Sequence, residues 1–117
     1  MKIKITERGW PGHFCACFDC TFRRNTLIEK GKRRIVVSTV GNYRPNGHGH
    51  EAAQTIGCSR YYETMAFEAI KQGNYWEANI DRDVPFTSPW AINKVNCNTD
   101  ILANDMHEAV VKELCGK

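Results

Sequence analysis

The sequence lacks the features that mark membrane proteins and exported proteins. No apolar run approaches the roughly 20 residues that a membrane-spanning helix needs. The N-terminus, MKIKITERGW, intersperses charges with β-branched residues and has no apolar stretch of the signal-peptide kind. Internal repeats and low-complexity segments are also missing. We therefore expect a chain that stays in the compartment where it is made.

The short motifs of several enzyme classes are absent too. GxxxxGK[ST], GxGxxG, HExxH and GxSxG do not occur, so phosphoryl transfer, glycine-fingerprint dinucleotide binding, metalloprotease and hydrolase chemistry have no support. His107 has Asp105 and Glu108 nearby in sequence, but a solvated helix face is the more frequent explanation of such a group. The sequence predicts neither an enzyme nor a cofactor, and we assign no catalytic residue.

The composition is that of one small globular domain. The chain has 117 residues, of which 42% are hydrophobic and 25% charged, which is ordinary for a folded domain spanning residues 1–117. Its net charge is +3, with 16 basic and 13 acidic residues interspersed. Local basic clusters, FRRN and KGKRR, lie in the first third and give a mild bias toward an anionic partner.

Six cysteines raise the question of a metal site. The segment HFCACFDC offers His13, Cys15, Cys17 and Cys20, and the distant His48, His50 and Cys58 are further candidate ligands. If the segment is a strand, Cys15 and Cys17 lie about 7 Å apart along it, too far for sulfurs about 2.3 Å from one zinc ion. Cys58, Cys97 and Cys115 are isolated singles. We expect buried thiols and no metal, with a zinc site as an alternative.

Alternation predicts a sheet in the first three quarters of the chain. Residues 2–7 and 13–18 alternate, and residues 21–29 and 33–41 flank KGK as a hairpin. Residues 61–70 and 75–86 predict a second hairpin around the KQGN turn. Between the hairpins, Gly41 to Ser59 is predicted to be a loop, and Pro89 favours a helix start or a tight turn.

The C-terminal segment predicts a helix. Asn98, Thr99 or Asp100 is a candidate cap, Gly116 a stop, and an apolar stripe has three- and four-residue spacing. The residues of that stripe are Leu102, Met106, Ala109, Val110 and Leu114. The expected fold class is α+β, a mostly antiparallel sheet of two hairpins with one long C-terminal helix packed on it.

Arginines and aromatic residues are interleaved along the sheet segments. Arginine binds phosphate bidentately and aromatic faces stack on bases, so the set favours an anion site for a nucleotide or single-stranded nucleic acid. Arg23 and Arg24 point to opposite strand faces, so at most one enters a given pocket. Phe22 beside them is expected to face the same ligand. The set comprises Arg8, Arg23, Arg24, Arg33, Arg34, Arg44, Arg60 and Arg82 with Trp10, Phe14, Phe22, Tyr43, Tyr61, Tyr62, Phe86 and Trp90.

Five blocks together resemble a family of small phage- and prophage-encoded proteins. They are ERGWPGHF, FRRNTLIEKGKRRIVVSTVG, RYYETMAFEA, SPWAI and NDMHEAVVKE, and they are distributed along most of the chain, from Glu7 to Glu113. The family is that of the Thoeris anti-defence proteins of the first type, the signal sponges. The resemblance implies a protein of the host cytoplasm that is not an enzyme. It would bind the cyclic ADP-ribose isomer made by a bacterial TIR-domain sensor and withhold that signal, undegraded, from the effector.

The same resemblance implies a site and an assembly. Family members form dimers that can build hexamers, with pockets near subunit contacts, and some also take up cyclic oligonucleotides. The ligand-binding positions that match are Arg24 or Arg23, Phe86, Asn96 and Asp105. Arg24 would clamp the pyrophosphate, Phe86 would stack on the adenine and Asn96 would bind a base edge or hydroxyl. A further arginine expected near the C-terminus is missing, and only Lys112 is near.

Two other functions stay open. The hairpin RRNTLIEKGKRR is basic enough to dock on a host defence protein or nuclease complex, so an inhibitor of that kind is one alternative. A small zinc-containing protein that binds nucleic acid is the other.

Overall fold

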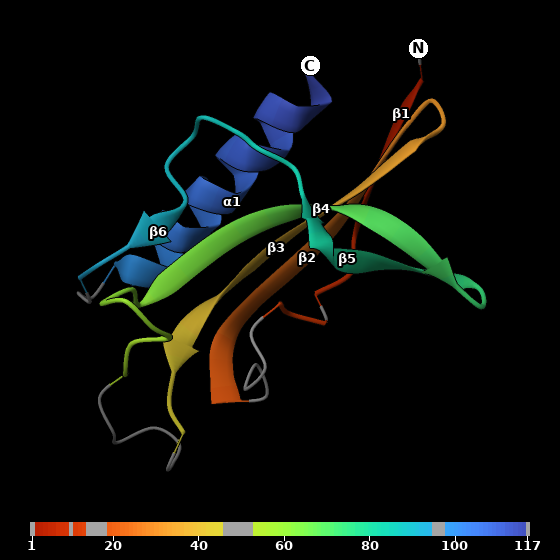
Figure 1. Ribbon diagram of the computed structural model, residues 1–117. Helices are drawn as coiled ribbons and strands as arrows, with labels where there is room; N and C mark the ends of the chain where they lie inside the picture. Colours follow the sequence, from red (N-terminus) through yellow and green to blue (C-terminus); the bar gives the residue numbers. More distant parts are fainter. Residues whose placement is uncertain (1, 10, 14–18, 46–52, 95–97, 117) are drawn as a thin grey trace.

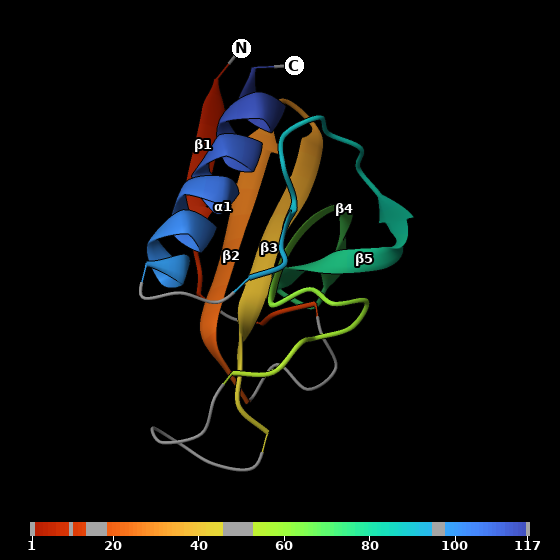
Figure 2. The same cartoon turned by 90° about the vertical axis from the view of Figure 1, so that its left-hand side faces the viewer.

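The fold is an antiparallel sheet with one helix packed across a face (Figure 1 and Figure 2). The structure, a computed structural model, describes residues 2–9, 11–13, 19–45, 53–94 and 98–116. Its strands are β1 (Ile3–Glu7), β2 (Cys20–Lys30), β3 (Arg33–Tyr43), β4 (Tyr62–Gln72), β5 (Tyr75–Asp83) and β6 (Ala91–Ile92), and its helix is α1 (Thr99–Cys115). The predicted α+β class is confirmed.

The strands form a meander in which each pairs with its neighbour in sequence. The sheet order is β1-β2-β3-β4-β5, and β6 pairs with the start of β4 on the edge that β5 leaves free. Both predicted hairpins are present, with two-residue connections that begin at Gly31 and Gly73. Both glycines have positive φ, at 63° and 59°, a conformation that glycine adopts without the steric cost of a Cβ atom. The second hairpin ends at Asp83 and not at Phe86.

The main core lies between α1 and the sheet face that it covers. Ile28, Ile35 and Val37 of the sheet are completely buried against Val110 and other apolar residues of the helix. Figure 2 shows α1 lying across this face. The contact follows from the helical period, because α1 repeats a buried side chain every three or four residues. These are Thr99, Ala103, Met106, His107, Val110, Val111 and Leu114.

The predicted stripe on the helix is only partly right. Met106, Val110 and Leu114 are buried as expected, but Leu102 is 47% exposed and Ala109 also faces solvent. The buried face of α1 is rotated toward His107 relative to the predicted stripe. The apolar pattern did not include His107 because histidine is not an apolar residue. That rotation makes a histidine part of the core.

The ends of the elements differ from the sequence patterns in several places. Ile3 and Ile5 of β1 are 37% and 54% exposed, because β1 is an edge strand that the helix does not cover there. Asn98 occupies the N-cap position without a side-chain cap bond, and Pro89 leads into β6 and starts no helix. Gly116 has a φ of −84°, so the helix end makes no use of glycine's extra freedom.

The long connection between the hairpins is shorter than predicted. β3 runs on to Tyr43, and bridges join Tyr43 to Gln54 and Gly57 to Arg60. Of the predicted strand at 13–18 only His13 is described, and it is not part of a strand; residues 14–18 and the histidines at 48 and 50 lie outside the described residues. No helix in the described ranges is long and apolar enough to cross a membrane.

Replacing Gly41 by alanine should destabilise the fold by on the order of 2 kcal/mol. A Cβ atom at this position would lie 2.4 Å from the Tyr62 ring and 2.6 Å from the Tyr61 carbonyl oxygen. Gly116→Ala is the matched control, because its Cβ would meet nothing closer than 3.6 Å. Urea denaturation of both variants tests this, and equal midpoints for the two would contradict the packing at Gly41.

Candidate functional site

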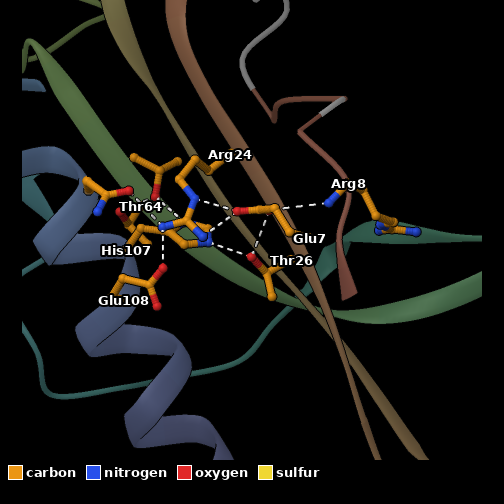
Figure 3. A network of polar contacts seen from close by, with 9 residues as sticks. Glu7, Arg8, Arg24, Thr26, Thr64, His107 and Glu108 are labelled. Carbon is orange, nitrogen blue, oxygen red and sulfur yellow. Dashed lines mark hydrogen bonds and ion pairs between the residues drawn. The ribbon is translucent and has the colours of Figure 1, made fainter. Parts of the chain in front are cut away.

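Arg24, the first of the sequence-predicted ligand residues, is occupied by contacts within the chain. Its guanidinium pairs with Glu7 of β1, donates to Glu108 Oε1 of α1 at 2.6 Å and donates to Asn104 Oδ1 at 2.9 Å. Figure 3 shows it held between the two carboxylates, and its side chain is 19% exposed. Arg24 therefore links β1, β2 and α1, and it lines neither of the two cavities described below.

Close to Arg24, a hydrogen-bonded series of hydroxyl groups runs through a buried histidine (Figure 3). His107 Nε2 lies 2.7 Å from Thr26 Oγ1, and His107 Nδ1 lies 2.7 Å from Thr39 Oγ1. The Thr26 hydroxyl donates to Glu7 Oε2 at 3.1 Å, so it accepts from Nε2–H of the ring. Nδ1 then accepts from Thr39, whose oxygen lies 2.6 Å from that of Thr64. The chain crosses four strands and the helix with every member paired.

His107 is neutral in this setting. The side chain is completely buried, and burial together with the charge of Arg24 lowers its pKa to about 3, against the smaller opposing effect of Glu108. The expectation of a solvated polar face was wrong. The threonines opposite the helix supply the hydrogen bonds that a buried imidazole needs.

The other predicted ligand residues do not gather around Arg24. Arg23 pairs in register with Val40 and points to the sheet face away from α1. Phe22 lies edge-on to Tyr62, 5.7 Å between ring centroids, and packs with the helix. Asp105 is exposed on α1, and Asn96 lies outside the described residues.

Among the described residues of the predicted set, Phe86 lines a cleft. The cleft, of about 630 Å³, lies at the outer edge of β4, between the part paired with β5 and the part paired with β6. The Val84 N–H donates to the Ala66 carbonyl oxygen at 2.8 Å, and the Thr64 N–H donates to the Trp90 carbonyl oxygen at 2.8 Å. Between these two hydrogen bonds, residues 85–89 diverge from the edge of β4, and this excursion forms the cleft.

Helix α1 holds the excursion in place through one carboxylate. The backbone N–H groups of Thr87 and Ser88 donate to Glu113 at 2.7 and 2.9 Å, and both hydroxyl groups donate to the same carboxylate. Phe86 packs against the main core from this segment. The wall of the cleft is therefore attached to both the helix and the sheet.

The cleft combines aromatic surface with one arginine. The Arg60 guanidinium lies 5.3 Å from the centre of the Trp90 ring, a cation–π distance, and Trp90 is 46% exposed. Arg60 Nε lies 2.7 Å from Glu63 Oε2. The other oxygen of Glu63 lies 2.9 Å from His13 Nε2, and this hydrogen bond lowers the pKa of Glu63 against the opposing effect of burial. Asp83 adds a second carboxylate to the walls.

The residues that support the alternative functions are described only in part. No group of three or more metal-ligating side chains occurs among the residues that the structure describes. Cys20 is buried and Cys58 exposed, while Cys15 and Cys17 fall outside the described ranges. In the basic hairpin, Arg33 pairs with Glu68 and Arg34 with Glu29. Much of its charge is therefore neutralised locally.

Arg60 and Trp90 belong to the site without having been singled out from the sequence. Both are members of the arginine–aromatic set, so a signal for them exists. The sequence does not show that the two side chains lie close together in space. Trp90 comes 30 positions after Arg60, and pairing along the edge of β4 brings the two residues together.

Comparisons of the chain with protein-family models, with curated proteins and with solved structures found no match.

Arg24→Ala should lower the free energy of unfolding by about 2 kcal/mol, because it removes hydrogen bonds between charged groups at a partly buried position. Arg33→Ala removes a pair that is 49% and 31% exposed and should cost about 0.5 kcal/mol or less. Chemical denaturation of the two variants compares them. Equal losses would show that Arg24 is not a structural link.

Acid should destabilise the protein through His107. The unfolded chain protonates this histidine below about pH 6.5, whereas the folded protein does so only near pH 3. The contribution of neutral His107 to the free energy of unfolding is therefore fully present above pH 6.5 and is lost as the pH falls toward 3. The loss approaches on the order of 4 kcal/mol. His107→Gln, less stable at neutral pH, should lose less on acidification. Parallel curves of unfolding free energy against pH for the two proteins would contradict this.

Proposed function

We propose that this protein binds a cyclic nucleotide immune signal, a cyclic ADP-ribose isomer, and sequesters it without degrading it. The observation that carries the proposal is the cleft at the edge of β4, where Phe86, Trp90 and Arg60 lie together. The resemblance to the signal sponges suggested the ligand class, and the cleft supplies residues of the kind that such a ligand requires.

The cleft suits a nucleotide in size and in chemistry. Its volume of about 630 Å³ falls within the range of about 300–1,000 Å³ typical of small-molecule sites. Most of its lining is apolar or aromatic, and a purine stacks on such surfaces. The pyrophosphate of the same ligand needs a fixed cation, and Arg60 is the arginine that lines this cleft.

In this proposal Arg60 takes the role first expected of Arg24. Phe86 keeps its role as the stacking residue and Trp90 adds a second aromatic surface, while Arg24 serves the fold. Asn96 follows β6 in the sequence, so its part as a reader of base edges stays a prediction. Cyclic oligonucleotides are a further candidate ligand class.

A sponge must hold its ligand for longer than the effector competes for it, which favours enclosure. Asp83, Pro85 and Trp90 on the cleft rim are exposed, so a single chain leaves the cleft partly open. We propose that a second copy of the chain covers it in a dimer or a hexamer. Ligand binding and oligomer formation would then depend on each other.

Arg60→Ala and Trp90→Ala should each weaken binding of cyclic ADP-ribose isomers at least about tenfold, since a stacked base or a phosphate contact is worth roughly 1–3 kcal/mol. Arg33→Ala, an arginine away from the cleft, is the control and should bind normally. Isothermal titration calorimetry measures the affinities.

Heating the purified complex should return intact ligand to solution, as detected by mass spectrometry. Recovery of a cleaved product would reject sequestration. If both cleft variants bind the ligand with normal affinity, the ligand binds at a different place on the protein.

A further inference from the structure

A chain of three charged or titratable side chains joins the cleft to the opposite side of β4. Arg60 lies over Trp90 in the cleft, and its Nε is 2.7 Å from one oxygen of Glu63. The other oxygen of Glu63 is 2.9 Å from Nε2 of His13, in the segment between β1 and β2. One carboxylate therefore pairs with both the Arg60 guanidinium and the His13 imidazole, of which only Arg60 lines the cleft.

His13 is held in a way that fits both of its charge states. Its Nδ1 lies 2.8 Å from Ser38 Oγ, and its backbone N–H donates to the same oxygen at 3.2 Å. A neutral ring accepts from the Ser38 hydroxyl at Nδ1 and donates to Glu63 from Nε2, whereas a protonated ring donates from both nitrogens. The side chain is 5% exposed and packs on Phe67, 6.0 Å between ring centroids. Both ring nitrogens of His13 therefore have a hydrogen-bond partner in either charge state.

A second cavity of about 190 Å³ lies beside the His13 ring. Tyr75 and Glu77 of β5 and Asn25 of β2 line it together with Ser38. Glu77 is thus a further acidic group on the side of His13 that faces away from the cleft. No arginine or lysine lines this second cavity among the described residues, but Arg8 adjoins it: its Nε–H donates to Asn25 Oδ1 at 2.8 Å, and its guanidinium lies 4.4 Å from the centre of the Tyr75 ring.

The charge balance around the cleft depends on this histidine. Arg60 contributes one positive charge, and Glu63 and Asp83 contribute two negative charges, so with neutral His13 the walls carry a net negative charge. Protonated His13 compensates the charge of Glu63 and brings the balance to zero. An anion in the cleft, opposed by both carboxylates, is then bound more favourably.

We propose that Glu63 and His13 are positioning residues of the cleft: Glu63 holds Arg60 beside Trp90, and binding of a pyrophosphate-containing ligand is coupled to the protonation of His13. The ligand class rests on the proposed function. The coupling is reciprocal, so the protein takes up a proton at His13 as the ligand binds.

ADP-ribose is a suitable probe, because its diester pyrophosphate keeps its charge between about pH 5.5 and pH 8, where histidine side chains change charge. Calorimetry should show binding about tenfold tighter at pH 5.5 than at pH 8. At pH 6.5, titrations in buffers of different ionisation enthalpy should show proton uptake. His13→Gln should bind with one affinity at both pH values. Equal affinity in the wild type, or no binding at either pH, would overturn the coupling.

Glu63→Gln tests the positioning of Arg60 and has a matched control in Glu68→Gln. Both residues are on β4 and both pair with an arginine, but Glu68 pairs with Arg33 away from the cleft. In the protein without ligand, the NMR resonance of Arg60 Nε–H should shift with pH together with the His13 ring signals. The shift should persist in Glu68→Gln and disappear in Glu63→Gln and His13→Gln.

The NMR measurement does not depend on whether a nucleotide binds. An Arg60 Nε–H resonance that does not shift with the His13 ring signals would overturn the inference. Circular dichroism of each variant identifies any that fails to fold. If ADP-ribose binds with proton uptake while cyclic isomers do not bind, the proposed function fails and this inference stands. If cyclic isomers bind but neither they nor ADP-ribose respond to pH, the inference alone fails.

Discussion

The arrangement of this fold depends on one buried hydrogen-bonded histidine. His107 lies between Thr26 of β2 and Thr39 of β3, and a displaced helix would leave an imidazole and two hydroxyl groups buried without partners. This requirement sets the register of α1 on the sheet. From that register follow two contacts of the helix with different parts of the sheet, Glu108 with Arg24 and Glu113 with the cleft wall.

The arginines fall into two groups that differ in the surroundings of the carboxylate with which they pair. Arg24 and Arg33 pair with carboxylates that join elements of the fold. Arg60 pairs with Glu63, whose second oxygen is engaged by His13, and it lies against an exposed tryptophan at a cleft. A high arginine content therefore indicates a ligand site only where the partner and the surrounding surface leave room for a ligand.

The sequence predicted the fold more completely than the site. Alternation and the two glycine-containing turns predicted both hairpins, because strand period and turn chemistry are local properties. The burial of His107 was missed because it depends on Thr26 and Thr39, which lie at least 68 positions away in the sequence. The contact between Arg60 and Trp90 was also missed, because it too joins residues that are far apart in the sequence. The family resemblance predicted both Phe86 and Arg24 as ligand-binding residues. Phe86 lines the cleft, whereas Arg24 pairs with Glu7 and Glu108.

In the proposed function, the ligand lies in the cleft at the edge of β4 and away from Arg24. A crystal structure of the protein with a cyclic ADP-ribose isomer tests this most directly. Our account predicts ligand density stacked against Phe86 or Trp90, with the pyrophosphate at the Arg60 guanidinium and the pair of Arg24 with Glu108 intact. Density at Arg24 with that pair broken, and an empty cleft, would contradict it.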